Sequence, residues 1–158
     1  MSELLETIPQ KGTITWIGVR PKRKETLIEV ERANITIEDG IEADHYSKKE
    51  GNRQVTLIQA EHLQAVAGML GRSEPISPLL TRRNIVVSGI NLIALKDKTF
   101  QIGKAILQGT GYCHPCSRME ENLGTGGYNA MRGHGGITAK VINGGIINLG
   151  DSVTFLGN

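Results

Sequence analysis

The sequence predicts a mostly-β protein, a barrel or a sandwich, in one domain with few helices. Short segments rich in β-branched residues recur along the chain, with turn residues between them. Strands and helices do not alternate regularly, which argues against a doubly wound parallel sheet. Glycine accounts for 20 of the 158 residues, about twice the average share, and scattered glycines suit a strongly bent, closed sheet.

The segments expected as strands are bounded by turn residues. They are 13–19, 26–30, 35–37, 55–58, 84–87, 105–108, 137–142, 146–147 and 152–156. Asn143-Gly144 lies between two of these strands, and this dipeptide predicts a tight hairpin. The basic segment 20–24 is expected to be a solvated hairpin tip, with recruitment of an acidic partner as the alternative.

Two helical segments are expected. Leu63, Val66, Ala67 and Leu70 recur at the spacing of one helical face, and Gly71 is a plausible stop. His62 falls off this apolar face, so we expect it to be solvated. Residues 117–123 form the second candidate, a helical turn with acidic residues near its start.

Length, charge and hydropathy narrow the class of protein. A chain of 158 residues is expected to fold as one domain, residues 1–158. The net charge of +2 and the 4% of aromatic residues do not fit a dedicated nucleic-acid binder. No apolar run approaches the roughly 18 residues of a membrane span, and the N-terminus is acidic where a signal peptide is basic. We therefore expect a soluble, cytoplasmic protein with neither a nucleic-acid nor a membrane partner.

The sequence Cys113-His114-Pro115-Cys116 is the strongest chemical signal, and several interpretations compete. A thioredoxin-like redox pair has this spacing, but normally in a strand–helix–strand setting that the expected elements lack. A zinc site needs further ligands, and the other histidines lack metal-ligand spacing. Haem attachment needs histidine where Ser117 stands. A single working thiol at Cys116 and two ordinary buried cysteines both stay open.

An ordered set of motifs accompanies the cysteines and carries a family resemblance. The motifs are GIEADHY (40–46), GNRQVTLI (51–58), RRNIVVSG (82–89), FQIGKA (100–105), PC (115–116), GGI (144–146) and GD (150–151). Together they closely resemble the MOSC domain, the module named for the C-terminal part of molybdenum cofactor sulfurase. The resemblance runs over about residues 12–156, nearly the whole chain.

The resemblance implies a distorted β-barrel that binds the molybdenum–pterin cofactor (molybdopterin) or handles its terminal sulfur. The key cysteine of the family follows a proline, which corresponds to Cys116, whereas Cys113 is an extra residue. In relatives that reduce N-hydroxylated compounds, this cysteine ligates molybdenum. The family's Gly-Asp reads Ala43-Asp44 here, which leaves open whether the local turn is kept.

The resemblance also implies partners. Reductases of the family usually carry an extra N-terminal barrel or an electron-transfer module, and the sulfurase has a pyridoxal-phosphate domain that generates the sulfur. None of these is expected within 158 residues. A separate cysteine desulfurase or electron-transfer partner would be needed, and whether this chain is an oxidoreductase or a sulfur-transfer component stays open. A thiol–disulfide protein using both cysteines and a non-catalytic cofactor carrier are the alternatives.

Several polar residues are candidates for cofactor binding. Arg83 and Asn84, and less strongly Arg82, could donate to the phosphate and pterin. Asp44 and His45 could bond pterin edges or supply a proton, or could be a capping Asp and an exposed His. Arg53 could anchor an anion or simply start a strand. We expect the residues on separate motifs to converge on one cleft: Asp44, His45, Arg53, Arg83, Asn84 and Cys116.

The glycine-rich segment 124–136 is a further candidate. Its backbone N–H groups could cradle an anion, with Arg132 and His134 closing over a ligand, or it could be a structural loop.

Cys116, rather than Cys113, is expected to carry the chemistry. A helical turn from Ser117 would place it beside unpaired backbone N–H groups, and Arg118 adds positive charge; both favour a thiolate. A thiolate is the form that ligates a soft metal or carries sulfur as a persulfide.

Overall fold

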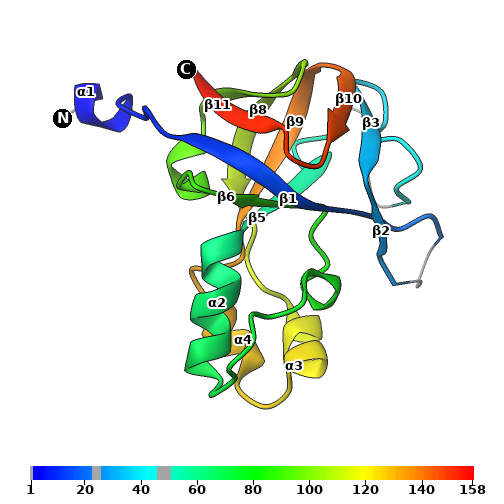
Figure 1. Cartoon of the computed structure of the whole chain (residues 1–158), viewed down its shortest axis with the longest axis vertical. Coiled ribbons are helices and arrows are strands. Elements are labelled where there is room, and N and C mark those ends of the chain that lie inside the picture. Colours follow the sequence, from blue (N-terminus) through cyan, green and yellow to red (C-terminus); the bar gives the residue numbers. More distant parts are fainter. Residues whose placement is uncertain (1, 23–25, 46–50) are drawn as a thin grey trace.

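The computed structural model describes residues 2–22, 26–45 and 51–158. Within these residues, seven strands close into a barrel, as the sequence predicts (Figure 1). In spatial order they are β11 (Ser152–Gly157), β7 (Thr99–Ile102), β8 (Ala105–Tyr112), β9 (Ile137–Asn143), β5 (Val55–Gln59), β6 (Ile85–Ser88) and β1 (Lys11–Val19). The first and last strands of the chain, β1 and β11, complete the ring by pairing antiparallel.

One pair of barrel strands, β5 and β6, runs parallel, and the helix α2 (Ala60–Met69) connects them. The expectation that the chain lacks a strand–helix–strand unit is therefore wrong, although the unit occurs only here in the described residues. Segment 70–84 between α2 and β6 is irregular apart from the 3-10 turn Pro78–Leu80, so the unit has no regular sequence pattern. Cys113 and Cys116 lie outside this unit, between β8 and the next helix.

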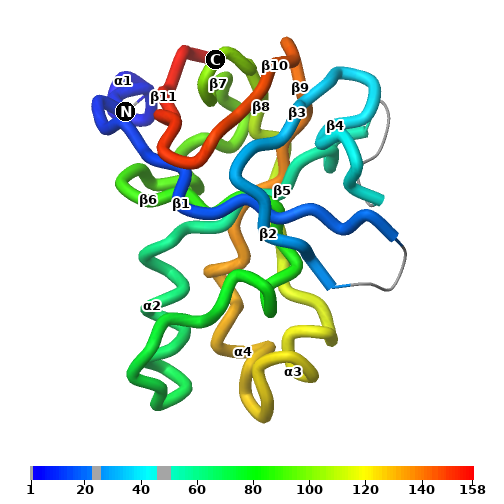
Figure 2. The backbone as a smooth tube through the Cα atoms, turned by 45° about the vertical axis from the view of Figure 1, so that its right-hand side comes forward, coloured from blue at the N-terminus to red at the C-terminus, as the bar shows by residue number. Residues whose placement is uncertain are grey.

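A small second sheet covers one side of the barrel (Figure 2). Its order is β10 (Gly145–Asn148), β3 (Arg32–Thr36) and β4 (Gly40–Ile41), while β2 (Ile28–Val30) extends the large sheet beyond β1. Ile35, Ile41 and Ile147 of the small sheet are fully buried and belong to the same apolar core as the barrel interior. The two sheets therefore share one apolar core.

The tight hairpin predicted at Asn143-Gly144 does not form, because β10 pairs with β3 and not with β9. A two-residue hairpin of the Asn-Gly kind needs positive φ angles at both residues, and neither residue has one. Instead, Gly144 lets the β3 backbone pass close by: a Cβ there would lie 2.5 Å from the carbonyl oxygen of Ile35. Gly144 thus allows the chain to pass close to the backbone of β3.

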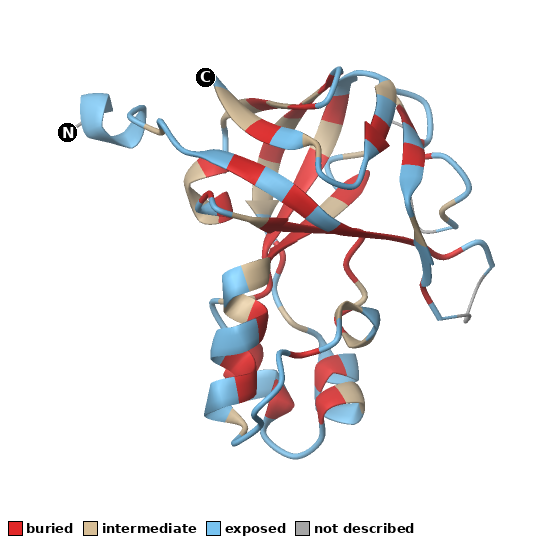
Figure 3. Cartoon of the chain, in the orientation of Figure 1, coloured by how far each residue is buried: buried red, intermediate tan, exposed pale blue. Residues whose placement is uncertain are grey.

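The helices α2, α3 (Ser117–Leu123) and α4 (Gly127–Met131) gather beyond one end of the barrel, whereas α1 (Ser2–Leu5) projects at the chain start (Figure 1). As predicted, α2 buries Leu63, Val66 and Ala67. These residues pack with residues of α3 and α4 and with the barrel strands in a second apolar cluster (Figure 3). No helix in the described residues has the length and apolar character needed to cross a bilayer.

The strand β1 shows how the helices change the strand pattern. Its first half alternates between exposed and buried residues, as a barrel strand with one wet face should. From Trp16 to Val19 every residue is buried, because the helical cluster covers the outer face there. A bulge between Ile14 and Trp16 shifts the register at the same place. β1 thereby spans both parts of the core and ends at Val19, so that Arg20 follows directly beside the candidate site.

Candidate functional site

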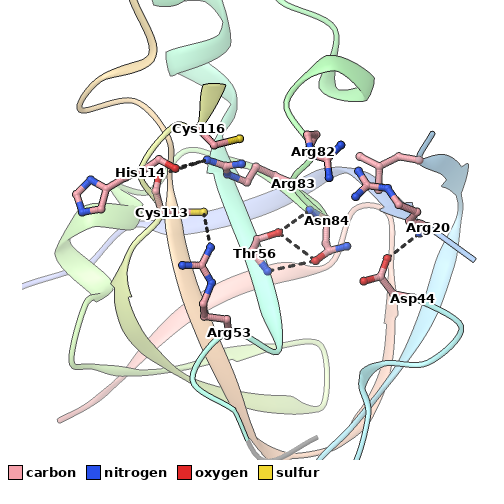
Figure 4. Close-up of a pocket in the computed structure, with 11 residues that line it drawn as sticks. Arg20, Asp44, Arg53, Thr56, Arg82, Arg83, Asn84, Cys113, His114 and Cys116 are labelled. Atoms are coloured by element: carbon pink, nitrogen blue, oxygen red, sulfur yellow. Dashed lines mark hydrogen bonds between the residues drawn. The ribbon is translucent and has the colours of Figure 1, made fainter. Parts of the chain in front are cut away.

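Loops from the helical end of the barrel surround a cavity of about 250 Å³ (Figure 4). The residues that line it come from the ends of β1, β5, β6 and β8 and the loops next to them: Arg20, Leu27, Asp44, Arg53, Thr56, Arg82, Arg83, Asn84, Cys113, His114 and Cys116. We call this cavity the arginine pocket. Five of the six residues expected to converge lie in it; His45 does not line it and is exposed.

Positive charge dominates the arginine pocket. Arg20, Arg53, Arg82 and Arg83 line it, against the single carboxylate of Asp44. The expectation that Arg20 belongs to a solvated hairpin tip is wrong, since its side chain is only 5% exposed. Residues 23 and 24 of the predicted tip lie outside the described residues. A pocket of this charge suits an anionic ligand, because guanidinium groups recognise phosphate and carboxylate by paired N–H donors.

Arg83 lies on the pocket wall, but its guanidinium donates mainly to the protein backbone. Nε donates to the Gly135 carbonyl at 2.8 Å, and Nη1 to the Thr81 carbonyl at 3.0 Å. Nη2 donates to the carbonyls of Cys113 and His114, at 3.4 and 3.3 Å. Burial lowers the pKa of Arg83, while the nearby cysteine sulfurs act in the opposite direction.

Asn84 also makes its hydrogen bonds within the protein. Its Oδ1 accepts from the backbone N–H and the hydroxyl of Thr56, at 3.3 and 3.0 Å, and its Nδ2 donates to the Gly18 carbonyl at 3.2 Å. These bonds tie together β1, β5 and the start of β6, as Figure 4 shows for Thr56. The expected pocket position of Asn84 is therefore observed, and its amide holds three strands in register.

The two cysteines differ sharply in exposure. Cys116 is exposed and lies immediately before α3, at its N-cap position, with its carbonyl accepting from the Met119 N–H at 2.9 Å. Cys113 is buried, and its Sγ accepts from Nη2 of Arg53 at 4.0 Å. Helix α3 begins at Ser117, as expected. The accessible thiol of the pair is thus Cys116.

Asp44 is anchored to the end of β1. Its carboxylate accepts from the Arg20 N–H at 2.7 Å, and the next residue, His45, donates its N–H to the Arg20 carbonyl at 2.6 Å. Ala43 has a φ of +69°, the left-handed conformation that glycine adopts without cost. The turn is therefore compatible with the glycine of the family motif, even though this chain has alanine there.

Arg132 and His134 do not line the arginine pocket. Arg132 lies at a different hollow, beside His114 and Pro115. The ring of His134 packs edge-on against that of His62, with centroids 4.7 Å apart. The expectation that His62 is simply solvated is wrong: it is half-buried, and its pKa is lowered by burial and by the neighbouring His134.

The glycine-rich segment 124–136 does cradle an anion, but the anion belongs to the protein. The carboxylate of Glu120 accepts from the N–H groups of Gly126 and Tyr128, at 2.9 and 3.0 Å. These bonds lower the pKa of Glu120. They also cap α4, a helix that was not expected within so many glycines.

Sequence reasoning missed Arg20, Thr56 and His114 as pocket residues. His114 was visible within the cysteine motif, and Thr56 within the strand that follows Arg53. For Arg20 the only signal was its position directly after a buried strand end. Within the described residues, no three His, Cys, Asp or Glu side chains gather as a metal site.

The comparisons with known proteins agree with this architecture. A family model described as MOSC domain matches residues 44–154. Among solved structures, the YuaD protein from Bacillus subtilis superposes with a TM-score of 0.80 at 18% identity, over 96% of this chain and 100% of that one. YiiM from Escherichia coli gives a TM-score of 0.68 at 18% identity, over 92% of this chain and 70% of that one.

YiiM from Geobacillus stearothermophilus gives a TM-score of 0.67, again at 18% identity, over 92% of this chain and 75% of that one. At this level of identity the three structures establish a shared fold. No curated protein sequence matches the chain significantly.

Proposed function

Because the chain belongs to the MOSC domain family, we propose that it binds the molybdenum–pterin cofactor in the arginine pocket and that Cys116 is the ligand to its metal or the carrier of its sulfur. The observation that carries the proposal is the meeting of an exposed thiol with four arginines in one cavity. The thiol suits the metal of such a cofactor, and the arginines suit its anionic part.

The donor types in the pocket fit the group. A cysteine sulfur is a soft ligand of the kind that thiophilic metals take. Guanidinium groups suit a phosphate, and the partly exposed carboxylate of Asp44 suits the N–H edge of a pterin. When bound, the cofactor would supply a redox-active metal with an exchangeable terminal oxygen or sulfur.

The residues of the chain have distinct tasks in this proposal. Cys116 presents its thiol from the loop end directly before α3, beside the guanidinium groups of the pocket. Arg53, Arg82 and Arg20 face the anionic end of the ligand. Arg83 and Asn84 support the pocket wall, through the hydrogen bonds to the backbone and between the strands described above.

The test is the molybdenum content of the protein purified from a host that makes the cofactor. We expect Cys116→Ser to lose nearly all bound metal and Cys113→Ser to keep most of it, with Ser117→Ala as the matched control beside the thiol. Elemental analysis by mass spectrometry gives the metal-to-protein ratio. Equal loss from both cysteine variants would favour a dithiol function, and full retention by Cys116→Ser would reject the proposal.

A second measurement separates the uses of a bound cofactor. Sulfur transfer is read by adding a cysteine desulfurase with cysteine and detecting a persulfide on Cys116 by peptide mass spectrometry. Reduction is read by turnover of a hydroxylamine with an electron-transfer partner. A protein that retains molybdenum but does neither is a cofactor carrier.

A further inference from the structure

One buried guanidinium joins three separate segments at the edge of the arginine pocket. Arg83 is 6% exposed, and its four side-chain hydrogen bonds go to carbonyl groups of Thr81, of the loop that carries both cysteines, and of Gly135. Every acceptor is a backbone atom. The side chain therefore fixes the path of the chain at each of these three places.

The two segments that Arg83 bridges are already in close contact. The N–H of Cys113 donates to the carbonyl of Gly136 at 2.8 Å. A Cβ on Gly135 would lie 2.0 Å from the carbonyl oxygen of Cys113, so only glycine permits this approach. The guanidinium lies across the junction, where its planar fork can reach carbonyl groups on both sides at once.

Arg83 also brings a buried positive charge to the wall of the arginine pocket. Within the described residues, it forms no ion pair with a carboxylate. Buried charges are normally paired or fully hydrogen-bonded, and here the carbonyl dipoles supply the hydrogen bonds. The positive charge remains at the pocket wall, close to both thiols.

We infer that Arg83 is a positioning residue that holds the Cys113–Cys116 loop against segment 135–136 and so fixes the place of the Cys116 thiol. The chemical use of that thiol rests on the proposed function, but the holding of the loop does not. Arg83 thereby differs from Arg53, which lies on the exposed side of the pocket.

Arg83→Lys is the informative variant, because lysine keeps the charge but cannot reach carbonyl groups on three segments. Two readouts follow the loop in protein without molybdenum: hydrogen exchange of the Cys113 amide, and the alkylation rate of Cys116 located by peptide mass spectrometry. We expect the Cys113 amide to exchange roughly tenfold faster or more, with core amides such as that of Leu57 little changed. The alkylation rate of Cys116 should change severalfold. Arg32→Lys, an exposed site on β3, is the control and should change neither readout.

Two results would overturn the inference. One is that hydrogen exchange and the alkylation rate are both unchanged in Arg83→Lys. The other is that loop and core amides exchange faster by the same factor, which would mean a general loss of stability. If the variant does not fold, the wild-type protein still provides a test. The Nε–H of Arg83 should exchange slowly in side-chain nuclear magnetic resonance, unlike that of exposed Arg118, and rapid exchange would reject the inference. Since no readout uses metal, failure to bind molybdenum would leave this result standing.

Discussion

Ala43 and Arg82 hold left-handed backbone conformations beside the arginine pocket, with φ angles of +69° and +63°. A residue with a Cβ pays about 1–2 kcal/mol for this conformation. Such strain is often found next to functional sites, where the surrounding structure maintains it. Both residues lie next to side chains that line the pocket, Asp44 and Arg83.

Ala43→Gly should stabilise the protein. Glycine relieves the left-handed strain, and part of the gain is lost because the unfolded chain becomes more flexible. We expect a net gain of about 0.5–1 kcal/mol, or a rise in Tm of roughly 1–4 °C for a domain of this size. Thermal unfolding measures it. Ala65→Gly, at an exposed position of α2, is the control and should destabilise by about 1 kcal/mol; a lower Tm for Ala43→Gly would show that the turn is unstrained.

At the scale of single residues, the sequence predicts the identity of most pocket residues better than their tasks. Arg83 and Asn84 lie at the pocket, and the hydrogen bonds described for them go to groups of the protein itself. The partners of such a bond are set by long-range packing: Gly135 and Arg83 are 52 residues apart in sequence. A short sequence motif therefore cannot show which distant residue accepts such a hydrogen bond.

Among the elements, α4 illustrates a helix held by a carboxylate from the preceding helix, α3. Glycines at 124, 126 and 127 disfavour helix, which is why the sequence suggests only a loop. The Glu120 carboxylate caps the helix start, while Ala130 and Met131 bury its inner face. Capping and packing together override the local propensity.

Glu120→Gln should weaken this cap in a pH-dependent way. The hydrogen bonds from Tyr128 and Gly126 lower the pKa of Glu120 in the folded state, so its charge adds stability above the pKa of the unfolded chain. That contribution is lost as pH falls below about 4.3 and through the folded-state pKa. We expect a lower Tm for the variant at pH 7 and a difference from wild type that shrinks as the pH is lowered towards 3. Glu121→Gln, one residue along and exposed, is the control; a constant difference across pH would contradict the assignment.

The strand predictions succeed where a segment has a local signal and fail where pairing is decided elsewhere. β7 is an exception: its alternation, with Phe100 and Ile102 buried, is a clear local signal, yet residues 99–102 are not among the expected strands. The pairing of β10 with β3 has no local signal, because Asn143-Gly144 predicts a different partner. Element type is thus more predictable than element pairing.

For the molecule as a whole, closure of the barrel depends on a short contact. β1 and β11 pair over Lys11–Thr13 and Ser152–Thr154. β11 also pairs with β7 on its other edge, so it has neighbours on both sides, and Val153 is completely buried in the core. Val153 is part of the large apolar core, so that core is incomplete without this strand.

Val153→Asp should therefore abolish cooperative folding. A carboxylate at this site would be buried without a partner, at a cost comparable to the total stability of a small domain. Ser152→Asp on the same strand faces solvent and should keep the wild-type fold. Circular dichroism and thermal unfolding distinguish the two outcomes. A cooperative transition in Val153→Asp with near-wild-type Tm would show that β11 is dispensable.

The pairing of β1 with β11 also decides when the barrel can close during protein synthesis. Among the strands of the barrel, β11 is the last to be synthesised and its partner β1 is the first. Residues of β1 and β6 can pair earlier, but the ring stays open, with unpaired edges, until β11 has left the exit tunnel. The nascent chain must keep a bare strand edge soluble until all seven barrel strands described here have been made.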